Sequence, residues 1–172
     1  MSRTRLSREK WITAGRAALA DHGPTALAAE PLSRALKTTK GSFYWHFKDV
    51  PAFQQAVIAQ WQADALQHVV EQLGRDDSAD QRLRQFGNMI LADRAEPQLR
   101  IWAQHDGDVR AVLAEVDEER LNYITRLLAQ LGLRNRDFAR ALQASLIGLP
   151  LLASPSDKAP FDTLVDTILA LE

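Results

Sequence analysis

Apolar residues recur along most of the chain at intervals of three and four positions, which places them on one face of an α-helix. The first such stripe, over residues 8–21, comprises Trp11, Ile12, Gly15, Ala18 and Leu19. No convincing run of alternating apolar and polar residues indicates a β-strand. The pattern therefore predicts an all-α protein with about nine helices.

Capping residues and helix breakers divide the N-terminal part of this pattern. Ser7 can cap the first helix, and Gly23-Pro24 can end it because proline cannot continue a helix. A short helix is expected at about 29–36 and another of about seven residues from Thr39, which can act as its N-cap. Lys37-Thr38 would form the turn between these two short helices.

A long helix is expected from Asp49, its N-cap, to about Leu73, with Gly74 at its end. The charged segment Arg75-Asp-Asp-Ser-Ala-Asp is the best candidate for a linker. Further helices are expected at about 80–94, 97–106, 108–131, 136–149 and 160–171, the third of them closed by Gly132.

Composition agrees with a globular protein, since 46% of the 172 residues are hydrophobic and 25% are charged. The absence of cysteine excludes a disulfide framework, a thiolate zinc site and a cysteine nucleophile. There is no secretory leader pattern and no apolar run of the ~20 residues that cross a bilayer. We therefore expect a cytoplasmic protein with no membrane partner.

Charge is distributed unevenly along the chain. The formal net charge is −1, but residues 1–48 hold nine Lys or Arg against three acids, whereas the remainder holds 12 basic and 19 acidic residues. A basic head and an acidic body indicate two units that face different partners.

The segment Lys37-Thr-Thr-Lys-Gly-Ser-Phe-Tyr-Trp-His-Phe-Lys48 carries side chains suited to nucleic acid. Three short helices with a tight turn before the third describe a helix-turn-helix. The alternative to a DNA-binding segment is a solvated corner between helices. Three consecutive aromatic side chains would be difficult to bury at such a corner, and exposing all of them to water would be unfavourable. The candidate contacts to phosphates or base edges are the lysines Lys40 and Lys48, the hydroxyls of Thr38, Thr39 and Ser42, the open backbone of Gly41, and the polar tips of Tyr44 and His46. Phe43 and Phe47, four positions apart, would face the core.

Residues 6–60 resemble the DNA-binding domain of the TetR (tetracycline-repressor, AcrR) family of bacterial transcriptional regulators. The most specific match is Lys40-Gly-Ser-Phe-Tyr-Trp-His-Phe-Lys-Asp49, which is close to the family motif that ends the recognition helix. The resemblance implies a DNA-binding domain at 1–50, with its recognition helix at about 39–46 in the major groove, and an effector-binding and dimerisation domain at 51–172. It also implies DNA contacts at Thr38, Thr39, Lys40, Ser42, Tyr44, Trp45, His46 and Lys48.

Three positions depart from the family pattern. Ala28 stands where a Thr or Ser usually caps the second helix, so either Thr25 takes over the cap or a phosphate contact is lost. Lys37 replaces the usual turn glycine and would be strained at positive φ. Thr38 replaces a valine, which weakens the small core but adds a hydroxyl.

The acidic body is compatible with the effector pocket and dimer surface that the resemblance implies. The candidate pocket residues are Trp61, Phe86, Met89, Ile90, Trp102, His105 and Tyr123, although such a set is more often ordinary core. The last two helices carry apolar stripes that could complete the chain's own core. The resemblance implies instead that their outer edges form a four-helix bundle with a second copy, through Leu142, Ser145, Leu146, Leu149, Leu164 and Ile168.

Two other classes of function are less well supported. His105-Asp-Gly-Asp108 is explained by a helix that ends at Gly107 and by Asp108 as the next N-cap, so neither a metal nor another cofactor is expected. No nucleophile turn, His-Glu-x-x-His or phosphate-binding glycine loop indicates an enzyme. A non-specific DNA-coating protein fits the basic head but not the acidic body. The sequence thus predicts a regulator, most simply a repressor that a small-molecule effector releases from a palindromic operator.

Overall fold

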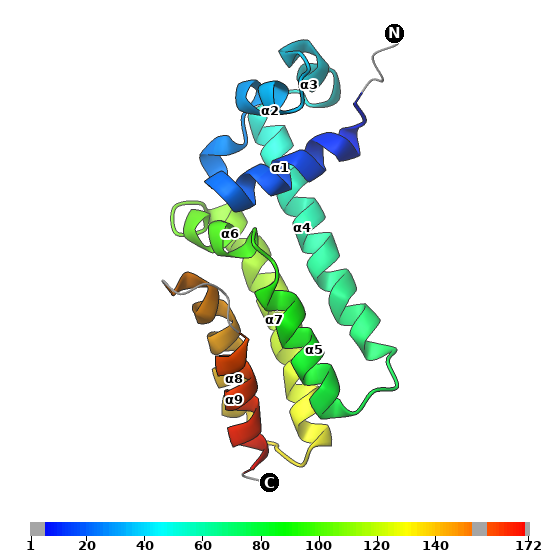
Figure 1. Cartoon of the computed structure of the whole chain (residues 1–172), viewed down its shortest axis with the longest axis vertical. Coiled ribbons are helices and arrows are strands. Elements are labelled where there is room, and N and C mark those ends of the chain that lie inside the picture. The colour runs from blue at the N-terminus through cyan, green and yellow to red at the C-terminus, as the bar shows by residue number, and fades with distance from the viewer. Residues whose placement is uncertain (1–5, 153–157, 171–172) are drawn as a thin grey trace. The chain divides into compact units, whose positions relative to one another are not determined.

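The computed structural model describes residues 6–152 and 158–170. Within these ranges the chain forms nine α-helices, two 3₁₀ helices and no strand, which confirms the all-α prediction (Figure 1). The α-helices are α1 (Arg8–His22), α2 (Ala29–Ala35), α3 (Lys40–His46), α4 (Val50–Leu73), α5 (Ala79–Leu91), α6 (Glu96–Trp102), α7 (Gly107–Gln130), α8 (Arg136–Gly148) and α9 (Ala159–Leu169). The 3₁₀ helices are η1 (Pro24–Ala26) and η2 (Leu149–Leu151).

Most helix ends lie where the capping residues predict them, but the start of α7 is a correction. The Asp106 carboxylate accepts hydrogen bonds from the backbone N–H groups of Asp108 and Val109, at 3.0 and 3.1 Å. Asp106 therefore caps α7 in place of Asp108, and Gly107 begins that helix instead of ending the previous one. The preceding helix α6 already ends at Trp102.

The chain divides into two compact units. The first joins the residues up to Asp64 with Arg94–Leu113, and the second joins Ala65–Asp93 with the residues from Ala114 onward. Helix α6 therefore belongs to the same unit as the helix-turn-helix. The functional division at residue 50 stays a prediction.

An aromatic cluster joins α1, α3 and α4 in the first unit. The rings of Trp11 and Phe53 approach Phe43 nearly edge-on, at centroid distances of 5.4 and 5.2 Å, and Phe47 lies 4.9 Å from Phe53. Because all four rings are buried, they fix the orientation of α3 on the two longer helices. This confirms the prediction that Phe43 and Phe47 face the core.

Helix α1 can approach α4 closely because position 15 has no side chain. A Cβ on Gly15 would lie 2.5 Å from Cζ of Phe53 and 2.9 Å from Val57, both shorter than van der Waals contact. The glycine in the first apolar stripe therefore serves helix packing.

The second unit has its own core, made by α5, α7, α8 and α9 with the end of α4. Helices α8 and α9 lie side by side (Figure 1). The side chain of Arg84 on α5 pairs with Asp162 and Asp166 on α9, and Gln143 on α8 donates to the carbonyl of Asp117 on α7. Deeply buried side chains of this core include Leu83, Phe86, Ile124, Leu127, Leu142, Phe161 and Val165.

Among the described residues, no helix is both long enough and apolar enough to span a membrane.

Candidate nucleic-acid interface

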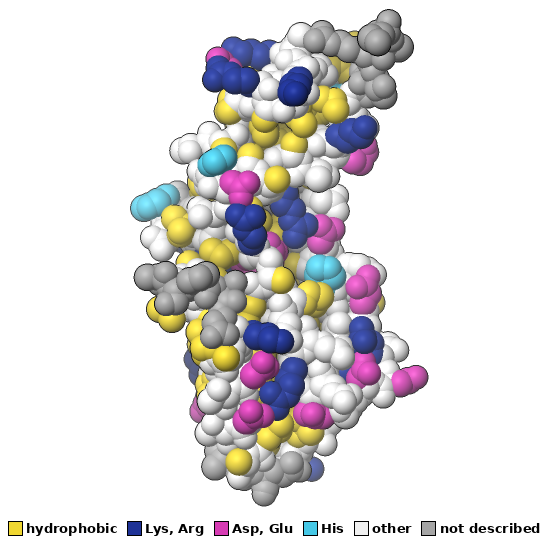
Figure 2. Space-filling view, viewed as in Figure 1, with side chains coloured by type: hydrophobic (Ala, Val, Ile, Leu, Met, Phe, Trp, Pro, Cys, Tyr) yellow, Lys and Arg dark blue, Asp and Glu magenta, His cyan; other side chains and the backbone are white. Residues whose placement is uncertain are grey.

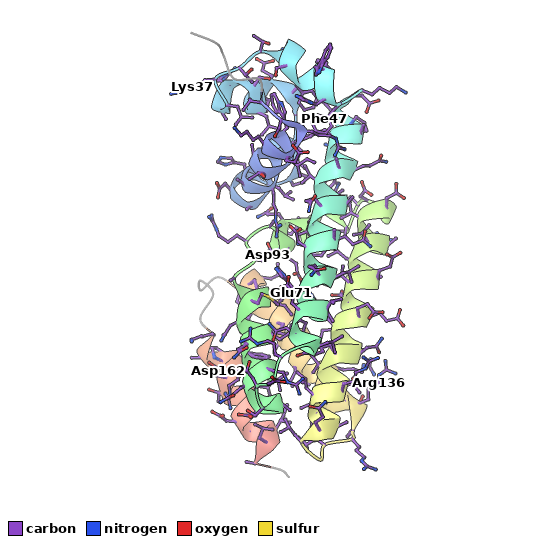
Figure 3. The ribbon with its side chains drawn as sticks, turned by 90° about the vertical axis from the view of Figure 1, so that its right-hand side faces the viewer. Lys37, Phe47, Glu71, Asp93, Arg136 and Asp162 are labelled. Carbon is purple, nitrogen blue, oxygen red and sulfur yellow. The ribbon has the colours of Figure 1, made fainter. Side chains whose placement is uncertain are left out.

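The turn between α2 and α3 is built around a residue in the left-handed region. Lys37 has φ 51°, which confirms the positive φ expected where this residue replaces the usual turn glycine. The N–H of Lys37 donates to the carbonyl of Arg34, at 3.1 Å, and the N–H of Thr38 donates to the carbonyl of Ser33, at 2.9 Å. These bonds end α2 and reverse the chain into α3, at an outer edge of the unit (Figure 3).

The first turn of α3 is capped and open to solvent. Thr39 Oγ1 accepts from the backbone N–H of Ser42 at 3.3 Å, which confirms Thr39 as the N-cap. Lys40 and Gly41 are exposed, while Thr38 and Ser42 are half-buried. The free N–H groups and exposed side chains at this end of α3 are therefore accessible to a ligand.

The outer face of α3 carries two aromatic side chains in solvent. Tyr44 is 52% exposed and Trp45 is 67% exposed, whereas Phe43 is fully buried in the same helix. The Tyr44 ring also packs edge-on against Phe43, with centroids 5.2 Å apart, so its direction is constrained. Helix α3 thus presents aromatic and polar groups outward from a rigid apolar base.

His46 joins the end of α3 to the segment before α1. Its Nε2 lies 2.7 Å from the carbonyl oxygen of Leu6, and because a carbonyl only accepts, Nε2 carries the proton. The guanidinium of Arg8 lies 5.2 Å from the centroid of the Phe47 ring on the same side. His46 is half-buried, and with Nε2 engaged its Nδ1 is the ring nitrogen that can contact an outside partner.

Lys48 lies in the short connection between α3 and α4. It is exposed, and the following residue, Asp49, caps α4 by accepting from the N–H of Ala52 at 2.8 Å. This confirms the predicted cap and fixes the backbone at Lys48.

The start of α2 lacks a side-chain cap. Ala28 occupies the N-cap position with extended backbone geometry, φ −135° and ψ 152°, and makes no side-chain hydrogen bond. Thr25 lies in η1 and does not replace the cap, so that alternative from the sequence is wrong.

Glu30, which is absent from the residues predicted from sequence, is joined to this face. Its Oε2 lies 2.9 Å from Nζ of Lys40 and its Oε1 lies 3.2 Å from Nη2 of Arg34. The hydrogen bond from Lys40 is the largest of the effects that lower the pKa of the Glu30 carboxyl below its usual range. The sequence feature that could have identified Glu30 is its position as the one acidic residue between Asp21 and Asp49.

Cationic side chains gather around the helix-turn-helix. Dark-blue groups at the top of Figure 2 lie on this unit. Four basic residues stand between Asp21 and Asp49, namely Arg34, Lys37, Lys40 and Lys48. All four are exposed, so the basic character predicted for the head is present at its surface.

Comparison with known proteins gives a consistent fold. No family model and no curated protein matches the sequence. A solved structure of a Rhodococcus protein described as a TetR-family transcriptional regulator is 20% identical, with a TM-score of 0.73 over 95% of this chain and 97% of that one. This chain has the TetR fold. A TetR-family regulator from Mesorhizobium loti (15% identity, TM-score 0.66, 99% and 98% covered) and an AcrR-family regulator from Aquifex aeolicus (11%, 0.67, 95% and 95%) also share it.

The predicted effector residues of this TetR fold are distributed over both units. In the second unit, Phe86 packs edge-on against Tyr123 at a centroid distance of 4.8 Å, Ile90 is buried in the same cluster, and Met89 packs against it. Burial is the largest cause that raises the pKa of Tyr123. The other three belong to the first unit, where Trp61 is buried, Trp102 is half-buried and His105 is exposed. The pocket stays a prediction.

A hollow of about 330 Å³ lies elsewhere in the first unit, between α1 and α4. The ion pair between Arg16 and Asp64 crosses it, and Gln60 donates to the same carboxylate at 2.8 Å. Its lining residues are Glu9, Ile12, Thr13, Arg16, Gln60 and Asp64, none of which was predicted as a site. Among the described residues, no group of three or more His, Asp or Glu side chains is placed to hold a metal ion.

The predicted dimer residues fall into two sets. Leu142, Leu146 and Ile168 are buried in the core of their own unit. Ser145, Leu149 and Leu164 are half-buried at the edges of α8, η2 and α9, respectively. Only the second set is accessible to another molecule, and the dimer surface stays a prediction.

Proposed function

We propose that this protein is a sequence-specific DNA-binding transcriptional regulator that inserts α3 into the major groove. The observation that carries the proposal is the outer face of α3, where Lys40, Tyr44 and Trp45 stand exposed on a buried aromatic base. The major groove of B-DNA is about 12 Å wide and admits one α-helix with its side chains. A helix held rigidly by its inner face can place its outer side chains on base edges reproducibly.

The side chains around α3 divide by their chemistry. Lys40 and Trp45 are in reach of base edges in this proposal, whereas Thr39, Tyr44, His46 and Lys48 surround them with donors for phosphate oxygens. Because Nε2 of His46 donates to the carbonyl of Leu6, His46 can donate to a phosphate only from Nδ1, which requires the imidazolium form. These phosphate contacts would set the register of α3 on the duplex.

A dimer and an effector complete the proposal. One recognition helix reads few base pairs, and a two-fold dimer places two of them about 34–36 Å apart on a palindrome. Ser145, Leu149 and Leu164 supply the accessible edges for that dimer. An effector that binds one arrangement of the two heads more tightly would weaken DNA binding by that difference in affinity, which makes the protein a ligand-released repressor.

The test is fluorescence anisotropy with labelled duplexes from the region upstream of the chain's own coding sequence. Lys40→Ala should weaken binding because it removes a base contact, whereas Lys48→Ala should reduce the slope of log K against log salt by about one because it removes a phosphate contact. Lys158→Ala is the matched control, since Lys158 is exposed and belongs to the second unit. Its isotherm should equal that of the wild type.

The same titration separates the proposal from non-specific coating. Specific binding should be at least 10³-fold tighter than binding to a scrambled duplex at physiological salt. Equal affinities for the two duplexes would support a DNA-coating protein and contradict the proposal.

The dimer has its own test in analytical ultracentrifugation. Leu164→Glu places a charge at the accessible edge of α9 and should shift the protein towards monomer. Thr163→Glu, on the adjacent exposed position of α9, is the matched control and should leave the mass unchanged. A monomeric wild type at micromolar concentration would contradict the dimer.

A further inference from the structure

Glu30 is an acidic residue on the basic surface around the helix-turn-helix. It is the one acid between Asp21 and Asp49, it forms ion pairs with Lys40 and Arg34, and its side chain is 58% exposed. A carboxylate that faced only phosphates would repel them and weaken binding. An acceptor in this position is useful if DNA offers it a donor, and in the major groove donors are found on bases and not on phosphates.

The partner of Glu30 is the lysine that opens the recognition helix. Nζ of Lys40 lies 2.9 Å from Oε2 of Glu30, and Lys40 is 57% exposed. An ammonium has three N–H donors, so two remain after this bond. An ionised carboxylate acts only as an acceptor, and Glu30 is ionised at neutral pH because Lys40 and Arg34 hold its pKa below the usual range of a glutamate. The pair thus presents a donor and an acceptor side by side to solvent.

A G·C base pair presents the complementary pattern in the major groove. Guanine offers two acceptors, N7 and O6, and cytosine offers a donor at N4 beside O6. O6 and N4 are joined by a base-pairing hydrogen bond of about 2.9 Å, which equals the separation of Lys40 Nζ and Glu30 Oε2. The two remaining N–H groups of Lys40 suit N7 and O6, and the free lone pairs of Glu30 suit N4.

The other base pairs fit less completely. An A·T pair alternates acceptor, donor and acceptor, so it offers no two adjacent acceptors to the lysine, and it adds the thymine methyl group. At least one charged group would then lose hydration without a full set of partners, which is costly.

We propose that the Glu30–Lys40 ion pair reads one G·C base pair in each half-site, with Lys40 on guanine and Glu30 on cytosine N4. This inference rests on the proposed function, because it requires α3 in the major groove. Glu30 becomes a specificity-determining residue contributed by α2, and the operator contains a fixed G·C pair at the place that the start of α3 reaches.

The experiment selects duplexes from a randomised library with the full-length wild type, Glu30→Ala, Lys40→Ala and Lys48→Ala. Wild-type protein should enrich a motif with an invariant G·C pair, and Glu30→Ala should relax that position alone. In anisotropy titrations, replacing this pair by A·T should weaken wild-type binding about tenfold, within the range typical of one good base contact, and should weaken Glu30→Ala binding less, because only the Lys40 contact is left to discriminate. Lys48→Ala is the control, since loss of a phosphate contact should weaken all duplexes alike. Both members of the pair are exposed, and circular dichroism checks that each variant is folded.

Two results overturn the inference in distinguishable ways. If the wild type enriches a motif and Glu30→Ala strengthens binding to every duplex while keeping the same motif, Glu30 only repels phosphates, and the proposed function survives without this inference. If the wild type enriches no motif, the proposed function and the inference both fail. A double-substituted protein adds a check, because Glu30→Ala and Lys40→Ala should be non-additive on the G·C duplex and additive on the A·T duplex.

Discussion

The ring of Phe161 on α9 lies directly against the backbone of Gly87 on α5. A Cβ at position 87 would stand 2.1 Å from Cε1 of Phe161 and 2.6 Å from its Cζ. Phe161 is fully buried, and because protein cores are close-packed, its ring can turn away only by displacing neighbouring side chains. The absence of a side chain at Gly87 therefore sets how closely α5 and α9 pack.

Gly87→Ala should destabilise the protein by about 1–3 kcal/mol, the usual effect of overpacking a core. Urea denaturation followed by circular dichroism measures the change. Gly148→Ala is the control, because a Cβ there would meet nothing within 4 Å, and it should stabilise α8 by about 0.5–1 kcal/mol. Equal stability of wild type and Gly87→Ala would contradict the close packing.

Lys37→Gly should raise the free energy of unfolding by about 1 kcal/mol. Lys37 has φ 51°, a region that costs an L side chain roughly 1–2 kcal/mol and costs glycine nothing. Thermal melting would show the increase. Lys37→Ala removes the same charge but keeps the strain, so stabilisation by alanine as large as that by glycine would contradict this explanation.

Ala28→Ser should supply the missing cap of α2. The extended backbone at Ala28 suits an N-cap, but Pro31 has no N–H, so the serine oxygen can accept only from Glu30 in the first turn. The expected gain is therefore about 0.5 kcal/mol, at the low end for caps. Denaturation detects the gain, and binding to upstream DNA should tighten because a hydroxyl donor is added beside the phosphates.

The control for that substitution is Ala59→Ser, at an exposed position inside α4. It should lower stability slightly, since serine is a poorer helix former than alanine. Equal effects at positions 28 and 59 would contradict a capping role.

The protein should lose stability at alkaline pH through Tyr123. Burial raises the pKa of Tyr123 above its ordinary value of about 10, so the unfolded chain releases that proton at a lower pH than the folded protein. The contribution is fully present below pH 10 and is lost as the pH rises through the folded pKa. Denaturation at pH 9 and pH 11 should show a smaller loss for Tyr123→Phe than for the wild type.

Tyr44→Phe is the control, since Tyr44 is half exposed and stands on the outer face of α3. It should lose as much stability between the two pH values as the wild type does. An unchanged loss in Tyr123→Phe would contradict the prediction.

Local sequence determined the helices and their ends. Ser7, Thr39 and Asp49 each cap the helix predicted for them, because a cap depends on a side chain and an N–H only three residues away. The helix-turn-helix and the inner face of α3 were likewise predictable, because the spacing of Phe43 and Phe47 alone places both rings on one side. The start of α7 was mistaken because Asp106 and Asp108 are equally good caps in sequence.

Tertiary structure decided which side chains meet across helices. Glu30 and Lys40 become partners because the left-handed turn at Lys37 sets the direction of α3 relative to α2, which no periodicity specifies. Gly87 and Phe161 lie 74 positions apart, and nothing in either local segment indicates that a ring will rest on that glycine. An apolar stripe likewise does not tell a core residue such as Leu146 from an edge residue such as Leu164. Short-range bonds can be read along the chain, whereas burial and pairing depend on how whole helices pack.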